Sequence, residues 1–195
     1  DFVRELHRRW LALQPQPKPP VPAVSEASLE PEDMVPGSIF ISYATEDRRA
    51  AEALCAGLSA REFDTWFDGK DLRGGDNYDA KIQRHIRACD LFVPLMSRNT
   101  QIRQDAYFRR EWTWARERLD GIGPERPFMM PVVIDDLDLK QTEDVRTYFE
   151  NSTRKVHVLR LPDGVPTPAA LEDFESAIKR VRSVLATANL DGPRS

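Results

Sequence analysis

A single glutamate, Glu111, lies in an aromatic-rich stretch where a carboxylate could do chemistry. The apolar residues that repeat at helical spacing around it are Phe108, Trp112, Ala115 and Leu119. At roughly 100° per residue, Glu111 falls about 60° from Phe108, at the border of this apolar stripe. Tyr107 lies one turn before Glu111 and shares its flank. The pattern therefore predicts a half-buried carboxylate beside an aromatic ring. The alternative is a solvent-facing Glu111 paired with Arg110 or Arg118, as is usual for helical glutamates.

Further candidates follow the predicted strands, at the sheet edge where open α/β sheets bind their ligands. Ser42, Tyr43 and Ala44 end the first strand, and they are candidates for lining a substrate site. Phe67 ends the second strand, where core packing is the alternative because the residue belongs to a strand. Ser97 ends the third strand, and its hydroxyl could bind a ligand or cap a helix.

The loop after the second strand combines backbone freedom with charge. It runs from Asp68 to Asp76 and includes Lys70, Arg73, Gly74, Gly75 and Asp76. The glycines offer mobility and free backbone amides, whereas the charged side chains could meet complementary groups on another copy of the chain. An exposed turn is the alternative interpretation.

Several other kinds of site are excluded by the sequence. The first strand is followed by Ser-Tyr-Ala-Thr-Glu-Asp, which is neither a glycine-rich dinucleotide fingerprint nor a phosphate-binding P-loop. The three histidines are isolated from one another, so we expect no metal site and no catalytic triad. With only two cysteines, a disulfide framework is not expected, and a reducing cytoplasm is the simpler setting.

The charge and hydropathy of the chain limit its partners. The net charge is −4, whereas proteins that bind nucleic acid usually carry a basic excess, so we expect no nucleic-acid partner. No apolar run approaches the roughly 20 residues that span a bilayer, so we expect no membrane partner.

The elements that must position these residues alternate along the chain. Apolar runs predict strands at 39–43, 63–67, 91–96, 128–134 and 155–161. Amphipathic segments between them predict helices, one capped by Thr45, one over about 104–119 and a final one capped by Thr167 with Pro168 in its first turn. This order predicts an α/β fold with a parallel sheet covered by helices on both faces.

The chain divides into four parts by composition. Residues 1–14 are an amphipathic helical segment, which we interpret as the end of an upstream domain. Residues 15–36 hold seven of the fifteen prolines and are typical of a linker. The α/β domain covers residues 37–187, and residues 188–195 form a tail.

Four blocks in this order resemble a bacterial-type TIR domain. They are IFISYATED at 39–47, FDTWFDGKDLRGGD at 63–76, ACDLFVPLMSRNTQ at 88–101 and YFRREWTWA at 107–115. The resemblance covers about residues 37–187 and implies a flavodoxin-like sheet of five parallel strands. Members of this family are either NAD⁺-cleaving enzymes with a catalytic helical glutamate or non-enzymatic adaptors. The position that matches this glutamate is Glu111, and Tyr107 occupies the aromatic position one turn before it.

The implied reaction is compatible with one carboxylate. Ordinary glycosidases need two carboxylates, because one must protonate the leaving oxygen. The nicotinamide of NAD⁺ is already cationic and leaves neutral, so one carboxylate can stabilise the oxocarbenium-like ribose that remains. NAD⁺ is then the substrate, and no cofactor is needed. Water would give ADP-ribose, and attack by the adenine would give a cyclic product.

Two functions follow from the resemblance. In the first, the chain is an NAD⁺ glycohydrolase or cyclase of bacterial antiphage immunity in the cytoplasm, joined to an upstream sensor domain and activated when TIR domains assemble into homo-oligomers or filaments. The loop at residues 70–76 would then be an assembly interface that also gates the pocket. In the second, the chain is a non-catalytic module that only recruits other TIR domains.

Overall fold

Five parallel strands form one sheet in the order β2-β1-β3-β4-β5. The computed structural model describes residues 38–67, 76–103, 106–150 and 155–190. The strands are β1 (Ile39–Ser42), β2 (Thr65–Trp66), β3 (Leu91–Met96), β4 (Val132–Val133) and β5 (Leu159–Arg160). All four pairings between neighbouring strands are parallel. The predicted fold, a flavodoxin-like parallel sheet with helices on both faces, is confirmed.

The regular part of some strands is shorter than the sequence predicts. Residues 128–134 continue to bond β3, since the Phe92 amide donates to the Phe128 carbonyl (2.7 Å) and the Met130 amide donates to the Phe92 carbonyl (3.0 Å). Only Val132–Val133 is regular strand. Pro131 precedes it and has no N–H to donate, so the ladder is interrupted there.

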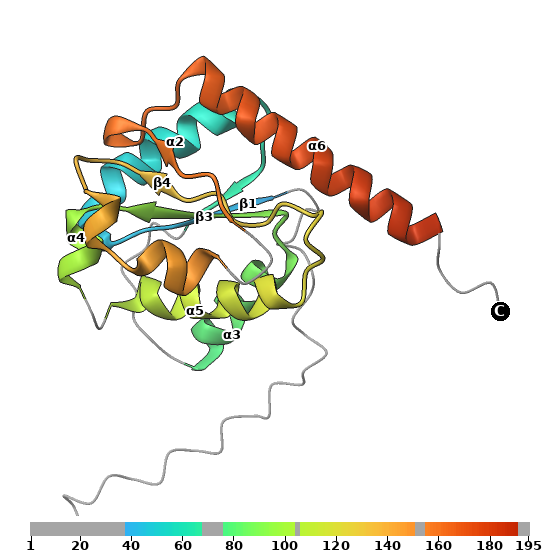
Figure 1. Cartoon of the computed structure of the whole chain (residues 1–195), viewed down its shortest axis with the longest axis horizontal. Coiled ribbons are helices and arrows are strands. Elements are labelled where there is room, and N and C mark those ends of the chain that lie inside the picture. Colours follow the sequence, from blue (N-terminus) through green and yellow to red (C-terminus); the bar gives the residue numbers. More distant parts are fainter. Residues whose placement is uncertain (1–37, 68–75, 104–105, 151–154, 191–195) are drawn as a thin grey trace, which may run out of the picture. The chain divides into compact units, whose positions relative to one another are not determined.

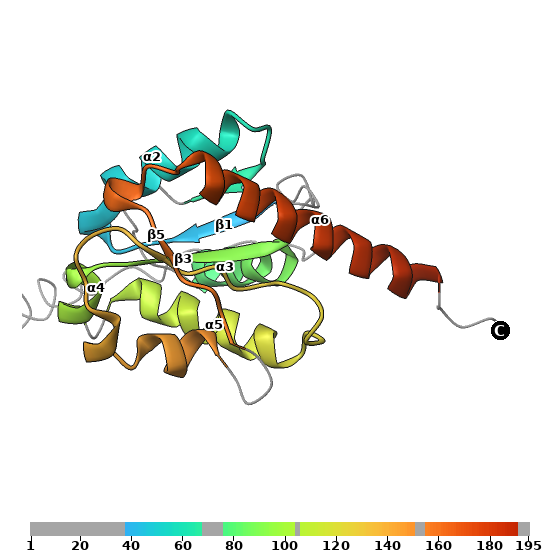
Figure 2. The same cartoon turned by 45° about the horizontal axis from the view of Figure 1, so that its top comes forward.

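Helices cover both faces of the sheet (Figures 1 and 2). They are α2 (Arg48–Ser59), α3 (Asp76–Ala88), α4 (Arg98–Ile102), α5 (Tyr107–Asp120) and α6 (Pro168–Leu190). Helices α2 and α6 pack on one face, and α3 and α5 pack on the other. Each face therefore has its own apolar core.

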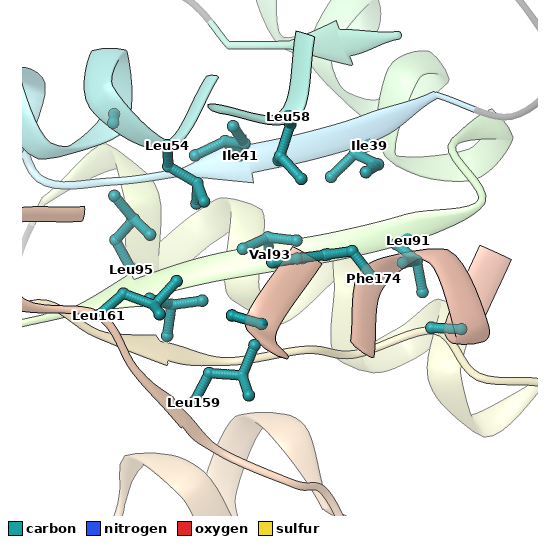
Figure 3. Close-up of a cluster of buried hydrophobic side chains, with 14 of the residues drawn as sticks. Ile39, Ile41, Leu54, Leu58, Leu91, Val93, Leu95, Leu159, Leu161 and Phe174 are labelled. Atoms are coloured by element: carbon teal, nitrogen blue, oxygen red, sulfur yellow. The ribbon is translucent and has the colours of Figure 1, made fainter. Parts of the chain in front are cut away.

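The strand β1 supplies both cores because its side chains alternate between the faces. Ile39 and Ile41 join the core under α2 and α6, which Figure 3 shows in close-up together with Leu54, Val93 and Phe174. Phe40 points to the other face and joins the core under α3 and α5. This alternation decides which helix each residue at the end of β1 can reach.

One of three predicted helix starts is confirmed, and two differ from the prediction. The cap of the last helix is confirmed, because the Ala170 amide donates to the Thr167 hydroxyl at 3.2 Å. Thr45 does not cap α2; it begins a short 3-10 helix, Thr45–Asp47, that leads into α2 at Arg48. The helix predicted from about residue 104 begins at Tyr107, and the short helix α4 before it was not predicted.

Some predictions fall on other parts of the chain. The helical segment 1–14, the linker 15–36 and most of the loop 68–76 lie outside the described residues. Among the helices that are described, none has the length and apolarity needed to cross a membrane.

Gly164 allows the chain to turn tightly between β5 and α6. Its φ is +73°, and a Cβ atom built on it would lie 2.1 Å from the Ala50 carbonyl oxygen of α2. Both the conformation and the close approach require glycine.

Gly164→Ala should therefore lower the free energy of unfolding by about 2 kcal/mol or more. The alanine would have to adopt a left-handed backbone conformation, and its Cβ would clash with the backbone of α2. The matched control is Gly123→Ala, whose added Cβ meets nothing within 4 Å. The control should change stability by less than about 0.5 kcal/mol. Urea unfolding of the three proteins measures both effects, and equal stability of the two variants would contradict the assignment of Gly164.

Candidate functional site

The site begins with a buried hydrogen bond between β1 and α5. Ser42 is the last residue of β1, and its hydroxyl donates to Oε2 of Glu111 at 2.5 Å. Ser42 is 1% exposed and Glu111 is 8% exposed. The structure thus places Glu111 deeper than the half-buried position that the helical pattern predicts. The alternative of a solvent-facing Glu111 is wrong.

Trp112 holds the serine from the other side. Its indole Nε1 donates to the Ser42 hydroxyl oxygen at 3.1 Å, and the indole is fully buried. Because the oxygen accepts from the indole, the hydroxyl proton is left to point at Glu111. Trp112 therefore fixes both the position and the direction of the hydrogen bond that the carboxylate accepts.

Arg109 anchors the turn of α5 that carries Glu111. Its Nη1 pairs with Oδ1 of Asp144 at 2.7 Å, and its Nη2 donates to the Thr100 carbonyl at 2.5 Å. The guanidinium also stacks on neighbouring rings, with its carbon 5.0 Å from the centre of the Trp112 ring. Both members of the ion pair are nearly buried, and additional hydrogen bonds compensate for their desolvation. The start of α5 is thereby fixed to the segment around Asp144.

Tyr107 connects the same turn to α3. Its hydroxyl donates to Oδ1 of Asp79 at 2.7 Å, and Arg110 pairs with the other carboxylate oxygen. Burial, the hydrogen bond to Asp79 and the negative charges of Asp79 and Glu111 together raise the pKa of Tyr107. The hydrogen bond from Tyr107 and the neighbouring Arg110 lower the pKa of Asp79. Tyr107 is therefore a neutral hydrogen-bond donor, and Arg110 is occupied away from Glu111.

A second buried carboxylate lies at the same edge of the sheet. Asp47 accepts hydrogen bonds from the Ser97 hydroxyl (2.5 Å) and from the Asn99 side-chain amide (2.6 Å). Burial raises the pKa of Asp47, and the negative charges of Asp135 and Glu46 raise it further, whereas the two hydrogen bonds lower it. Ser97 also caps α4, since its hydroxyl accepts from the Thr100 amide at 3.2 Å. Helix capping, one of the two predicted roles of Ser97, is thus present.

The structure separates the predicted substrate-binding residues between the two faces of the sheet. Ala44 and Tyr107 pack with the core under α3 and α5, the face that carries Glu111. Tyr43 and Phe67 pack against the opposite core, and their ring centres lie 6.2 Å apart. The sequence predicts Tyr43, Ala44 and Phe67 as one group because all three lie at strand ends. The alternation of side chains that begins in β1 places Tyr43 and Ala44 on opposite faces.

The predicted assembly loop contributes little to the described part of the site. Asp76 is the first residue of α3. Lys70, Arg73, Gly74 and Gly75 lie outside the described residues.

The buried histidine His85 and the buried cysteine Cys89 have structural roles. The ring of His85 is buried and stacks on Trp66, with centres 4.4 Å apart. Burial raises the pKa of the Cys89 thiol to about 12, so this thiol is a poor nucleophile at neutral pH. Within the ranges that the structure describes, no cluster of histidine, cysteine and acidic residues could hold a metal ion.

Two parts of the site were missed by sequence reasoning. The helical pattern identifies Trp112 only as an apolar residue, although its indole N–H donates to Ser42. Asp47 and Asn99 were not singled out at all. A signal for the first was available: Ser42 is a polar residue at an inward position of a buried strand, and such a residue needs a partner.

The comparisons with known proteins identify one family. The family model described as TIR domain matches residues 39–178, a range that contains all five strands and both Ser42 and Glu111. No curated protein matches the chain.

Solved structures with a similar fold are distant. The CMP N-glycosidase BcmB of Clostridium botulinum is 13% identical with a TM-score of 0.45, covering 71% of this chain and 98% of that one. The TIR domains of the activated Roq1 resistosome are 19% identical with a TM-score of 0.45, covering 80% and 85%. A diflavin flavoprotein A3 from Nostoc sp. is 17% identical with a TM-score of 0.44, covering 82% and 99%.

The raised pKa of the buried Asp47 makes the stability of the protein depend on pH. The folded protein binds the Asp47 proton more tightly than the unfolded chain does, because the folded pKa is raised above 3.8. The stability contributed by Asp47 is therefore complete below the unfolded pKa and is lost as the pH rises through the folded pKa. Asp47→Asn has no such titration, so the variant should gain stability relative to the wild type as the pH rises above about 4, the ordinary pKa of an aspartate.

Urea unfolding of both proteins at a series of pH values measures this difference. Asp173→Asn, which removes a carboxylate from the exposed side of α6, is the matched control. A stability difference between Asp47→Asn and the wild type that stays constant with pH would rule out the titration of Asp47.

Proposed function

This chain belongs to the TIR-domain family, and we propose that it cleaves the bond between nicotinamide and ribose in NAD⁺ with Glu111 as the catalytic carboxylate. The observation that carries the proposal is the buried hydrogen bond from Ser42 to Glu111 at the carboxyl end of β1. This is the sheet edge at which open α/β folds bind their ligands.

The chemistry needs a negative charge that is already in place. When the bond between nicotinamide and ribose breaks, nicotinamide leaves as a neutral molecule and the ribose becomes oxocarbenium-like. A carboxylate held near the ribose stabilises that positive charge without reorganising, and its effect is larger where water is excluded. Glu111 suits this role because the Ser42 hydroxyl and the Trp112 indole hold its Oε2 in one place.

The neighbouring residues are assigned roles by their positions. Ala44 and Tyr107 lie on the same face of the sheet as Glu111, and we assign them, with Ser42, to the nicotinamide and ribose side of the site. Ser97 lies at the end of β3 with its proton already donated to Asp47, so it can only accept a hydrogen bond from a ribose hydroxyl. Tyr43 and Phe67 belong to the opposite face and are assigned to the rim beyond the strand ends.

The fate of the ribosyl group depends on the acceptor. Attack by water at the anomeric carbon completes a hydrolysis to ADP-ribose, and the water loses one proton. Attack by a nitrogen of the adenine ring gives a cyclic product instead. Both routes begin with the same loss of nicotinamide, so both need the same carboxylate.

The biological setting of the proposal is bacterial antiphage defence in the cytoplasm. An enzyme that destroys NAD⁺ has to be inactive by default. We propose that a sensor domain upstream in the same chain and assembly of TIR domains through the loop at residues 70–76 supply this control. Head-to-tail contacts between copies need not close into a ring, so filaments fit this kind of control.

Glu111→Gln tests the catalytic role. The substitution keeps the size of the side chain and its ability to accept from Ser42 but removes the charge. Loss of a positioned electrostatic group commonly costs 10²–10³ in rate, or about 2.7–4 kcal/mol. The rate of nicotinamide release from NAD⁺, measured by chromatography, should fall by about this factor, while the melting temperature changes little.

The control is Glu117→Gln, the same change at an exposed position six residues further along α5. It should cleave NAD⁺ at the wild-type rate. Equal rates for Glu111→Gln and the wild type would remove Glu111 from the reaction. No cleavage by the wild type at any protein concentration, from nanomolar to high micromolar, would favour the non-catalytic module. A specific activity that rises with protein concentration supports control by assembly.

A further inference from the structure

A cavity lies between the C-terminal halves of α3 and α5. Its volume is about 520 Å³, within the range of sites for small molecules. Trp114 and Arg118 line it from α5, Ile86 and Arg87 from α3, and Ile122 and Arg126 from the segment after α5. Arg118 lies seven residues beyond Glu111, which is about 10 Å along the helix axis. The cavity is thus at the amino edge of the sheet, opposite to the candidate active site.

Arg118 forms a rigid part of the wall. Its Nη1 donates to the carbonyls of Ile86 and Cys89, the latter at 2.7 Å, and its guanidinium lies 4.4 Å from the centre of the Phe128 ring. Burial and the positive charge of Arg126 both lower the pKa of Arg118. The two guanidinium groups therefore repel each other in a place where water screens them poorly.

Arg126 lacks hydrogen bonds that a buried guanidinium normally makes. Its side chain is 16% exposed, and its Nη2 lies 3.6 Å from Oδ1 of Asp90, which is too long for a hydrogen bond. Its Nε is buried and has no hydrogen-bond partner among the described residues. Arginine carries five N–H donors, so Arg126 has the capacity to bind an additional acceptor.

Arg87 adds a third positive charge that can reach a ligand. It is exposed in the last turn of α3, and none of the ion pairs between described residues involves it. Among the described residues, the acidic side chain in the wall is Glu117, and Asp90 lies 3.6 Å from Arg126, so three guanidinium groups outnumber two carboxylates there. The cavity favours anions.

We propose that this cavity binds the phosphate group of a small molecule, such as a nucleoside monophosphate, through Arg87 and Arg126. Guanidinium groups bind phosphate with two parallel hydrogen bonds, and a phosphate would relieve the repulsion between Arg118 and Arg126. The cavity is larger than a phosphate needs, and Trp114, Ile86 and Ile122 give it an apolar wall on which an aromatic base can pack. The proposal does not depend on the cleavage of NAD⁺.

Nuclear magnetic resonance on the full chain can locate the binding. The probes are adenosine monophosphate, inorganic phosphate and adenosine. Adenosine monophosphate should shift the indole N–H signal of Trp114 and the amide signal of Ile122, and it should leave the indole signal of Trp112 at the other site unchanged. Inorganic phosphate should bind at the same place about tenfold more weakly, and adenosine should not bind at millimolar concentration.

Arg87→Gln and Arg126→Gln should each weaken the binding of adenosine monophosphate about tenfold, because each removes a charge-assisted hydrogen bond. Arg87 is exposed and makes no ion pair or side-chain hydrogen bond with another described residue, so Arg87→Gln should keep the wild-type melting temperature. Arg61→Gln, a surface change on the opposite face of the sheet, is the matched control and should bind normally.

Four results would overturn the proposal. They are no binding of adenosine monophosphate, shifts confined to Trp112, equal affinity for adenosine monophosphate and inorganic phosphate, and an unchanged affinity of Arg87→Gln.

Discussion

A carboxylate buried between a sheet and a helix must accept hydrogen bonds from groups that are themselves held in place, and Ser42 meets this constraint for Glu111. An ionised carboxylate left without such a partner would favour unfolding or take up a proton. The indole N–H of Trp112 donates to the Ser42 hydroxyl oxygen, and this leaves the hydroxyl proton pointing at Glu111. The hydrogen bond thus requires the last residue of β1 and the second turn of α5 to meet in one arrangement.

The remainder of the α3 and α5 face serves this arrangement. Arg109 and Asp144 tie the start of α5 to the segment after β4, and Tyr107 ties it to α3 through Asp79. Each contact restricts the movement of the helical turn that carries Glu111. The opposite face, under α2 and α6, consists mainly of aliphatic side chains (Figure 3) and supports the sheet from behind. The fold therefore separates the positioning of the carboxylate from most of the aliphatic packing that supports the sheet.

The sequence is sufficient to predict the fold and the position of Glu111 beside the core, and the reasons are physical. Long apolar runs predict buried parallel strands, and the helical period around Phe108 places Glu111 beside the core.

The sequence is not sufficient to predict contacts between residues that are far apart in the chain. Ser42 and Trp112 are separated by 70 positions, and nothing in either local pattern indicates that they meet. Asp47 was missed for the same reason, because its partners Ser97 and Asn99 come from another strand end. Tyr43 and Phe67 were grouped with Glu111 because strand ends share an edge, whereas alternation assigns each side chain to a face.

If Ser42 acts on NAD⁺ cleavage by holding Glu111, the two side chains are energetically coupled, and a double-mutant cycle measures that coupling. The rate of nicotinamide release is measured for the wild type, Ser42→Ala, Glu111→Gln and the double variant. Ser42→Ala should slow the wild type about tenfold, because the carboxylate loses a buried charge-assisted hydrogen bond. In the Glu111→Gln background the same change should have little further effect, since no charge remains to be positioned. If Ser42→Ala slows both backgrounds by the same factor, Ser42 acts independently of Glu111, which contradicts its role in holding the carboxylate.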